Sequence, residues 1–553
     1  MRRSSLRLIA ASFIIPQLAR TAPQYNRLPM TREGLTPEAL GRVLEEFLAS
    51  ASAAAVFENG EELFRFSHDA SSARYSISGE HGKSLLHLWS SERNAVRRVL
   101  DAEIKQDHLL LHVQRFGQAK PSKLEILRDR DQRTPAAKKA ARSVYQQGLS
   151  RVLERAFPDF SVGRLSSAMD LERSFGPTYA RGLLRRGRSA FAVLGVNAQE
   201  TQASIDAALT FALLWLHACR EKESGRLAVE GLKLFVPEGT SAVLRERMAC
   251  LNQTAAKLEL YELEERDRAI TQMDCRDRGN IKTHLVRYVD QRATEERFRE
   301  SIEHIAALLG TNAGRVELVA LSPAQLAFRC HGLEFARSRL GQHSGSLKTS
   351  PEIVFGAGAH ETLLTKDTDA LFASMVNRIF GSRHPKADRN NPLWRMQPER
   401  WLESLVVRDV GAIDSALDNS SVYSQVPAFS ASDRAMIDVL AATRDGRLAV
   451  LELKADEDIH LPLQGLDYWA RVAWHHARGE FQQFGYFSGR ELSAQPPWLI
   501  LVAPALHLHP ATDILLRYLS PEIDWMLAGI DERWREGVRV IFRKRTAARA
   551  AGA

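Results

Sequence analysis

Two short apolar segments joined by an Asp-Gly pair constrain this chain more than any other feature. They read MIDVLAAT, beginning at Met436, and LAVLEL, beginning at Leu448. An Asp-Gly pair between two such runs is a strong β-hairpin signal, so we expect adjacent antiparallel strands here. Strand side chains alternate between faces, and Glu452 and Lys454 therefore share one face. The hairpin would place Asp438 beside Glu452 on that same face.

The polar groups at this strand end need an explanation. Two carboxylates and a lysine ammonium are costly to bury unless they pair with each other or bind a cation. One reading is an exposed ion pair between Glu452 and Lys454, which would contribute little to stability. That reading does not account for Asp438 in an otherwise apolar strand, nor for Gln464 ten residues after Lys454. We therefore expect a functional site.

The order of these residues resembles the PD-(D/E)XK nuclease superfamily, whose core motif is an acid, a hairpin and then Glu-x-Lys. The match covers roughly residues 398–540. In many members a glutamate on the preceding helix and a glutamine on the following helix complete the site. Here these correspond to Glu403, within PERWLESLV, and Gln464. The resemblance implies a restriction-endonuclease-like α/β core with a mixed sheet.

The resemblance also implies a divalent cation, which neutralises charge on a phosphodiester and lowers the pKa of an attacking water. Mg²⁺ prefers hard oxygen ligands and keeps several waters, and Mn²⁺ could substitute for it. Asp438 and Glu452 would be the carboxylate ligands, with the carbonyl oxygen of Leu453 as a third. Lys454 would orient the water or stabilise developing negative charge, and Gln464 would fix the water.

Two further helix faces contribute candidates. Gln464 shares a helical face with Tyr468 and with Arg471 or Val472, so Tyr468 and Arg471 could hold the phosphate or the lysine. Glu403 would assist at the metal from the first helix, but Glu399 lies one turn earlier and competes for that role.

The charge balance favours an anionic partner. The formal net charge is +8, from 75 basic and 67 acidic residues, and the C-terminal run RWREGVRVIFRKRTAAR is strongly basic. Arg543, Lys544 and Arg545 in that run are candidates for contacts with a nucleic-acid backbone, although a charged, solvated tail is the alternative. The cluster RGLLRRGR at 181–188 is a second basic patch.

The chain is expected to act in the cytoplasm. Its four cysteines are widely spaced, which argues against a zinc ribbon or a disulfide scaffold. The apolar run near the N-terminus is short and ends at Pro16, so it makes a poor signal peptide, and Met30 is an alternative start. No stretch reaches the ~20 apolar residues of a membrane helix, so no membrane association is expected.

The length favours several domains, and the pattern of elements predicts a multidomain α/β protein. Within the β-rich part, SSERNAVRRVLDAE at 90–103 is predicted to be a helix. The predicted parts are residues 1–45 (tail and first helix), 46–130 (β-rich domain), 140–275 (α/β domain), 276–385 (connecting α+β region) and 386–553 (nuclease-like domain).

The middle and C-terminal parts give the same order of strands and helices, which suggests a duplicated fold whose first copy is degenerate. The alternative is two unrelated α/β segments with generic order. Sliding one segment over the other by 257 residues aligns FAVLGVN with LAVLELK. The positions that then coincide are Arg181 with Asp438, Gly195 with Glu452, and Asn197 with Lys454.

These features predict a Mg²⁺-dependent deoxyribonuclease that hydrolyses phosphodiester bonds. The alternative is a catalytically silent protein that binds nucleic acid, or serves assembly, and keeps the nuclease fold. Whether the target is DNA or RNA, duplex or single strand, and cut internally or from an end stays open. So does the presence of a homodimer or a protein partner.

Overall fold

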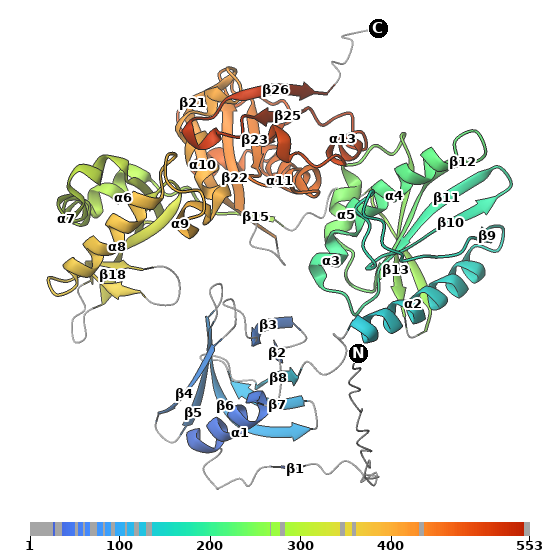
Figure 1. The fold of residues 1–553 in the computed structure, drawn as a ribbon, viewed down its shortest axis with the longest axis horizontal. Coiled ribbons are helices and arrows are strands. Elements are labelled where there is room, and N and C mark those ends of the chain that lie inside the picture. The colour runs from blue at the N-terminus through green and yellow to red at the C-terminus, as the bar shows by residue number, and fades with distance from the viewer. Residues whose placement is uncertain are drawn as a thin grey trace, which may run out of the picture. The chain divides into compact units, whose positions relative to one another are not determined.

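A computed structural model gives the fold (Figure 1). The chain is a mixed α/β protein that divides into two compact units, Met1–Lys138 and Lys139–Ala553. The structure describes residues 26–27, 36–49, 54–58, 61–66, 74–80, 83–89, 94–105, 108–114, 121–128, 135–265, 267–276, 283–342, 349–356, 361–430 and 436–546. The signal-like run, Met30 and the end of the basic tail lie outside these residues.

The first unit is a β-sheet with one helix packed on it, as the β-rich prediction requires. Helix α1 (Pro37–Ala49) follows Thr36 with proline at its first position, which suits a helix start. The strand order is β3-β2-β8-β7-β6-β5-β4, with β1 beside β6. The strands are β1 (Asn26–Arg27), β2 (Ala54–Glu58), β3 (Glu61–Phe66), β4 (Arg74–Glu80), β5 (Lys83–Trp89), β6 (Asn94–Lys105), β7 (His108–Gln114) and β8 (Ser122–Arg128).

The predicted helix at 90–103 is wrong, because Asn94–Lys105 forms strand β6 between β5 and β7. A register shift between Val99 and Asp101 marks a bulge, at which one extra residue is inserted in the strand. As a result Val99 and Ala102, three residues apart, both face the core. Because of the bulge, two core-facing residues are three positions apart. That spacing is typical of a helix, whereas a regular strand has a period of two.

The second unit contains two α/β lobes. The first, which we call the middle lobe, spans residues 139–275, with strand order β14-β13-β12-β11-β10-β9. Its helices are α2 (Pro135–Ala156), α3 (Gln202–Asp206), α4 (Ala208–Lys222) and α5 (Ala242–Ala249). Its strands are β9 (Ser161–Val162), β10 (Ala180–Arg186), β11 (Ser189–Gly195), β12 (Ala228–Pro237), β13 (Lys257–Glu264) and β14 (Ala269–Met273).

The second, the C-terminal lobe, spans residues 386–546, and strand β15 from the preceding segment extends its sheet. The order is β15-β21-β22-β23-β24-β25-β26. Its helices are α9 (Pro392–Arg395), α10 (Pro398–Arg408), η2 (Val410–Ala412), α11 (Leu461–His476), α12 (Glu480–Gln483), η3 (Ala505–His507), α13 (Thr512–Leu516) and η4 (Trp534–Glu536). The strands are β15 (Thr283–Leu285), β21 (Leu417–Ser430), β22 (Met436–Thr443), β23 (Leu448–Leu453), β24 (Trp498–Pro504), β25 (Trp525–Ile530) and β26 (Val540–Arg545).

The two lobes share strand order and strand direction. Each has an antiparallel hairpin, β10/β11 or β22/β23, followed by two parallel pairs and an antiparallel edge strand. One face of each sheet is covered by the helix that precedes the hairpin, α2 or α10. The other face is covered by the crossover helix, α4 or α11. The flanking helices therefore lie on corresponding faces.

The alignment by 257 residues is wrong by one position in the second strand of the hairpin. In the C-terminal lobe Leu453 pairs with Val502, and the amide of Lys454 donates to the Val502 carbonyl at 2.9 Å. In the middle lobe the amide of Val196 makes the same bond, to the carbonyl of Phe235 at 3.1 Å. Val196, not Asn197, is therefore the counterpart of Lys454.

The counterpart of Glu452 is accordingly Leu194, not Gly195. Leu194 lies opposite Arg181 in the first hairpin. The second hairpin pairs Val439 with Leu451, so its next step brings Asp438 opposite Glu452. The hairpin turn is one residue longer in the C-terminal lobe, and sequence alignment without gaps misses this difference.

The lobes pack against each other reciprocally: α4 contacts α13, and α11 contacts α5. Leu251 and Leu519, which follow α5 and α13, form an antiparallel bridge, and apolar residues from both lobes make one buried core. Arg247 on α5 donates two hydrogen bonds, at 2.9 and 2.7 Å, to the carboxylate of Asp467 on α11.

The connecting module lies between the lobes in sequence, and its strand order is β16-β17-β18-β19-β20. The charged segment 288–310 contains two helices, α6 and α7, with a break at Phe298. Its helices are α6 (Gln291–Arg297), α7 (Arg299–Leu309), η1 (Gly310–Arg315) and α8 (Asp369–Ser382). The strands are β16 (Glu317–Ser322), β17 (Gln325–Cys330), β18 (Leu333–Gln342), β19 (Thr349–Phe355) and β20 (Thr362–Leu363).

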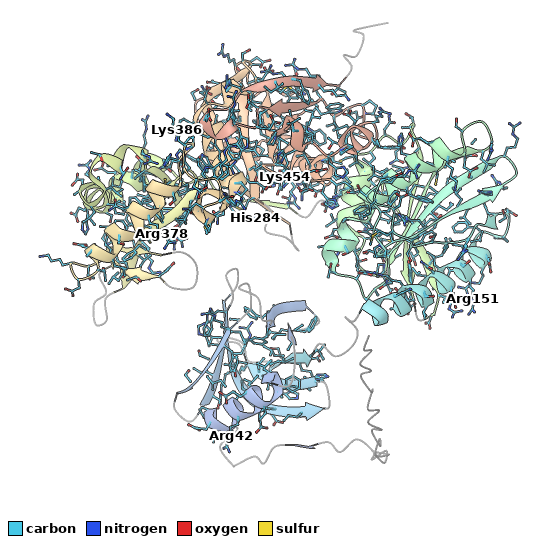
Figure 2. All side chains as sticks on the ribbon, in the orientation of Figure 1. Arg42, Arg151, His284, Arg378, Lys386 and Lys454 are labelled. Carbon is cyan, nitrogen blue, oxygen red and sulfur yellow. The ribbon has the colours of Figure 1, made fainter. Side chains whose placement is uncertain are left out.

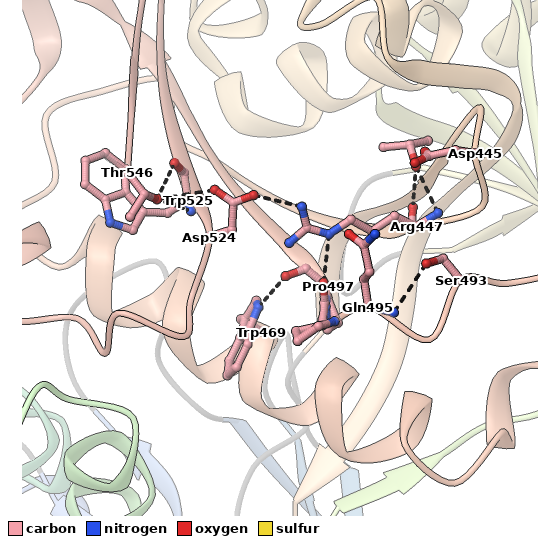
Figure 3. Close-up of polar contacts among 11 residues, drawn as sticks. Asp445, Arg447, Trp469, Ser493, Gln495, Pro497, Asp524, Trp525 and Thr546 are labelled. Carbon is pink, nitrogen blue, oxygen red and sulfur yellow. Dashed lines mark hydrogen bonds and ion pairs between the residues drawn. The ribbon is translucent and has the colours of Figure 1, made fainter. Parts of the chain in front are cut away.

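The Asp-Gly turn between β22 and β23 forms as predicted. Gly446 has φ +86°, a conformation that glycine adopts without strain. Arg447, just before β23, donates to the Pro496 carbonyl and to Asp524, both at 2.8 Å (Figure 3). These bonds fix the start of the strand whose other end carries Glu452. No helix among the described residues is long and apolar enough to span a membrane.

Candidate metal and phosphodiester site

The site begins where the β22/β23 ladder opens. Regular pairing ends at Val439 and Leu451, and the Asp438 carboxylate then accepts the amide hydrogen of Leu453 at 3.1 Å. Because the N–H and C=O of one strand residue point the same way, the Leu453 carbonyl also points toward the Asp438 side. Burial raises the pKa of Asp438, and the Leu453 amide opposes that shift.

Glu452 is 2% exposed, on the face covered by α11. A Cβ atom at Gly465 of α11 would lie 3.5 Å from the Glu452 Cβ, so helix and strand are in close contact here. Glu452 Oε1 lies 3.2 Å from the Lys454 ammonium, but Oε2 is buried without a hydrogen-bond partner among the described residues. Burial, and then the Asp438 charge, raise the pKa of Glu452 well above its usual value.

Lys454, labelled in Figure 2, directly follows β23. Its ammonium lies among carboxylates. Its Nζ lies 3.7 Å from both Glu399 and Asp458. Burial alone would lower the pKa of Lys454. The charges of Glu452, Glu399 and Asp458 raise it, so the side chain stays an ammonium. The Glu399 carboxylate therefore lies close to the Lys454 ammonium. Asp458, four residues after Lys454, also belongs to this group of charged side chains.

Glu403, from the middle of α10, is 6% exposed. It accepts hydrogen bonds from Gln425 at 2.7 Å and from Arg400 at 3.1 Å. Burial raises its pKa to about 7, and the nearby charge of Asp438 adds to the shift. The two glutamates of α10 thus take different places, Glu399 beside Lys454 and Glu403 beside Gln425.

Gln425 was not predicted from the sequence, and the structure adds it to the site through its hydrogen bond to Glu403. It lies in β21 between Ser424 and Val426, whose partners in β22 flank Asp438. Its φ of +52° is uncommon for a residue with a side chain, and such strain concentrates at functional positions. In the sequence, a single glutamine within a strand looks the same whether it faces a site or the surface.

Helix α11 brings Gln464 and Tyr468 toward the carboxylates. Gln464 lies in the first turn, and its Oε1 is buried without a partner among the described residues. Burial raises the pKa of Tyr468, and the charges of Glu452 and Asp438 raise it further, which places the phenol near both. Arg471, one turn later, is 5% exposed.

The C-terminal basic residues do not join this group. They lie on β26, the edge strand of the sheet. Arg543 and Arg545 contact Asp414, and Arg543 also donates to the Ile413 carbonyl. Lys544 pairs with Asp513. These residues lie on an exposed strand and have acidic partners, and the end of the basic run lies outside the described residues.

No protein-family model matches this chain, and no curated protein matches it in sequence. What the site can do therefore follows from its chemistry. No set of three or more His, Cys, Asp or Glu side chains among the described residues is arranged to hold a metal ion. Asp438 and Glu452 still fit a hard cation, because Glu452 has a buried carboxylate oxygen without a partner among the described residues and Mg²⁺ needs only one or two carboxylates.

Proposed function

We propose that the C-terminal lobe is a restriction-endonuclease-like core and that the protein is a metal-dependent nuclease. The buried Glu452 carboxylate, the half-buried Asp438 carboxylate opposite it and the Lys454 ammonium 3.2 Å from Glu452 carry the proposal. Surface packing does not require such a group, and burying it costs stability. Charged groups whose pKa values are shifted by burial and by each other are typical of active sites.

Each residue of the site has a proposed role that follows from its side-chain chemistry. Asp438, Glu452 and the Leu453 carbonyl would hold Mg²⁺, with Mn²⁺ as a substitute. When bound, the cation supplies charge neutralisation on a phosphodiester and acidifies a water. Lys454 offers a fixed positive charge at the position where negative charge develops during hydrolysis.

Helix α11 and helix α10 supply the orienting groups. The unpartnered Oε1 of Gln464 can accept a hydrogen bond from the attacking water. Tyr468 keeps its proton because its pKa is raised, so its hydroxyl can donate to a phosphate oxygen. Glu403, whose pKa is raised to about 7, can exchange a proton near neutral pH.

The proposal is tested with the full-length protein and labelled single-stranded DNA, duplex DNA and RNA, each with Mg²⁺, Mn²⁺ or EDTA. We expect cleavage with either cation and none with EDTA. Lys454→Ala and Asp438→Ala should abolish cleavage while leaving the melting temperature within a few degrees. Unchanged cleavage in either variant contradicts the assignment, and salt-sensitive binding without cleavage favours the silent nucleic-acid-binding protein.

A further inference from the structure

A cleft of about 540 Å³ lies between the connecting module and the C-terminal lobe, beside the carboxylate site. Strand β16 of the module forms one wall, and α10 and β21 form the other. Glu403 and Gln425 line it, as does Met436, two residues before Asp438. One end of the cleft therefore reaches the residues that surround the proposed metal ligands.

The cleft carries a positive charge balance. The charged residues that line it are Arg287, Arg329, Arg400 and Arg408, against Glu317 and Glu403. Arg408 pairs with Glu317 at 3.3 Å and Arg400 with Glu403 at 3.1 Å. Arg287 is exposed and has no ion pair with any residue of the described ranges. A guanidinium held free in this way is suited to a phosphate oxygen.

Aromatic rings lie at the same cleft. Tyr288, Tyr423 and Tyr486 line it and pack edge to face or tilted, with ring centroids 5.2 to 5.5 Å apart. Tyr288 is the least anchored of the three, because Tyr423 and Tyr486 use their hydroxyl groups in hydrogen bonds to the backbone. Bases stack on such rings with little sequence preference.

The two walls of the cleft are in direct contact with each other. A Cβ atom at Gly332, between β17 and β18, would lie 2.1 Å from the Arg400 carbonyl of α10, so the two backbones touch. Arg383, which is fully buried, donates to the carbonyls of Cys330 and His331 in the module and of Met396 before α10. The cleft is thus a feature of packed structure and needs no closure.

From these observations we infer that the cleft binds an unpaired nucleic-acid strand beside the scissile phosphate. A cavity of this size accommodates a ligand of one or two nucleotides. It cannot admit a duplex, whose major groove alone is about 12 Å wide. The inference rests on the proposed function and narrows its substrate to single strands or unpaired ends. Arg287 would contact the backbone, and Tyr288 would stack on a base.

Binding is measured without cleavage, by fluorescence anisotropy in EDTA, with the full-length Asp438→Asn protein as the background. The probes are a fluorescein-labelled oligothymidylate and a blunt duplex of the same length. The single strand should bind more tightly. Arg287→Gln should weaken its binding about 3- to 10-fold and reduce the slope of log K against log salt by about 0.7. Tyr288→Leu should weaken it about 5-fold or more.

The matched control is Arg378→Gln on α8, an exposed arginine of the same module outside the cleft, which should bind like the background protein (Figure 2). Unchanged single-strand binding in Arg287→Gln, or a duplex that binds as tightly as the single strand, overturns the inference. If the cleft binds single strands but the wild-type protein cleaves nothing with Mg²⁺, the nuclease proposal fails, and only the binding of an unpaired strand by the cleft is supported.

Discussion

The middle and C-terminal lobes have the same strand order but different side chains at one pair of facing positions in the hairpin. Where the C-terminal lobe has Asp438 facing Glu452, the middle lobe has Arg181 facing Leu194. Leu194 is fully buried in the apolar core, and Arg181 lies over the ring of Phe175 at 4.4 Å. The fold therefore does not need the carboxylates, and we expect their burial in the C-terminal lobe to cost stability.

The largest expected effect separates activity from stability in the C-terminal lobe. Glu452→Leu installs the side chain that the middle lobe has, and Lys454 keeps Glu399 and Asp458 at 3.7 Å. We expect cleavage to fall by about 1,000-fold or more. Replacing buried ionic groups with an apolar residue of similar volume is often neutral or stabilising by about 1–4 kcal/mol. Cleavage and thermal melting measure both effects.

A drop in melting temperature together with retained cleavage would reverse this interpretation of Glu452. Glu452→Gln serves as the control, because it keeps the shape and polarity of the side chain and removes only the charge. It should lose cleavage as fully as Glu452→Leu does.

The reverse exchange tests the middle lobe. Leu194→Glu places a carboxylate among apolar side chains without a lysine two residues later, because Val196 occupies that position. We expect the free energy of unfolding to fall by about 4 kcal/mol or more. Denaturant unfolding measures it, with Leu194→Met as the control of similar volume. A Leu194→Glu protein as stable as the wild type would show that the middle lobe retains room for a charged site.

The pH dependence of stability should reveal Glu403. Its pKa is about 7 in the folded protein, against an ordinary 4.5, so the folded state binds this proton more tightly than the unfolded state. The free energy of unfolding should therefore fall as pH rises from about 4.5 to about 7, by on the order of 3 kcal/mol. Glu403→Gln, which keeps the bond to Gln425, should lose this part of the dependence in metal-free buffer. If the free energy of unfolding of Glu403→Gln depended on pH as that of the wild type does, the raised pKa of Glu403 would be contradicted.

The smallest effect is expected at Arg181, the counterpart of Asp438. Arg181→Met keeps the length of the side chain and removes its position over Phe175 and its bond to the Ala168 carbonyl. We expect a loss of about 1–2 kcal/mol in the free energy of unfolding and no change in cleavage. A large loss of cleavage would mean that the middle lobe takes part in the reaction.

The sequence was sufficient for the hairpin, because the Asp-Gly turn and the alternation of LAVLEL fix both strands and one face. The resemblance suggested Gln464, and helical spacing then predicted that Tyr468 lies on the same side of α11. The sequence did not reveal Gln425, whose strand position becomes informative only when β21 pairs with β22. It also misaligned Gly195, because a turn longer by one residue leaves no trace in an ungapped comparison.

Direct measurement of cation binding tests the central claim. Mn²⁺ binding to the full-length protein, followed by electron paramagnetic resonance without substrate, should reveal a site in the wild type and in Arg181→Met. Asp438→Asn, which can still accept the Leu453 amide hydrogen, should lose that site while keeping its melting temperature. Retention of the same Mn²⁺ affinity in Asp438→Asn would contradict the assignment of this carboxylate pair as the metal site.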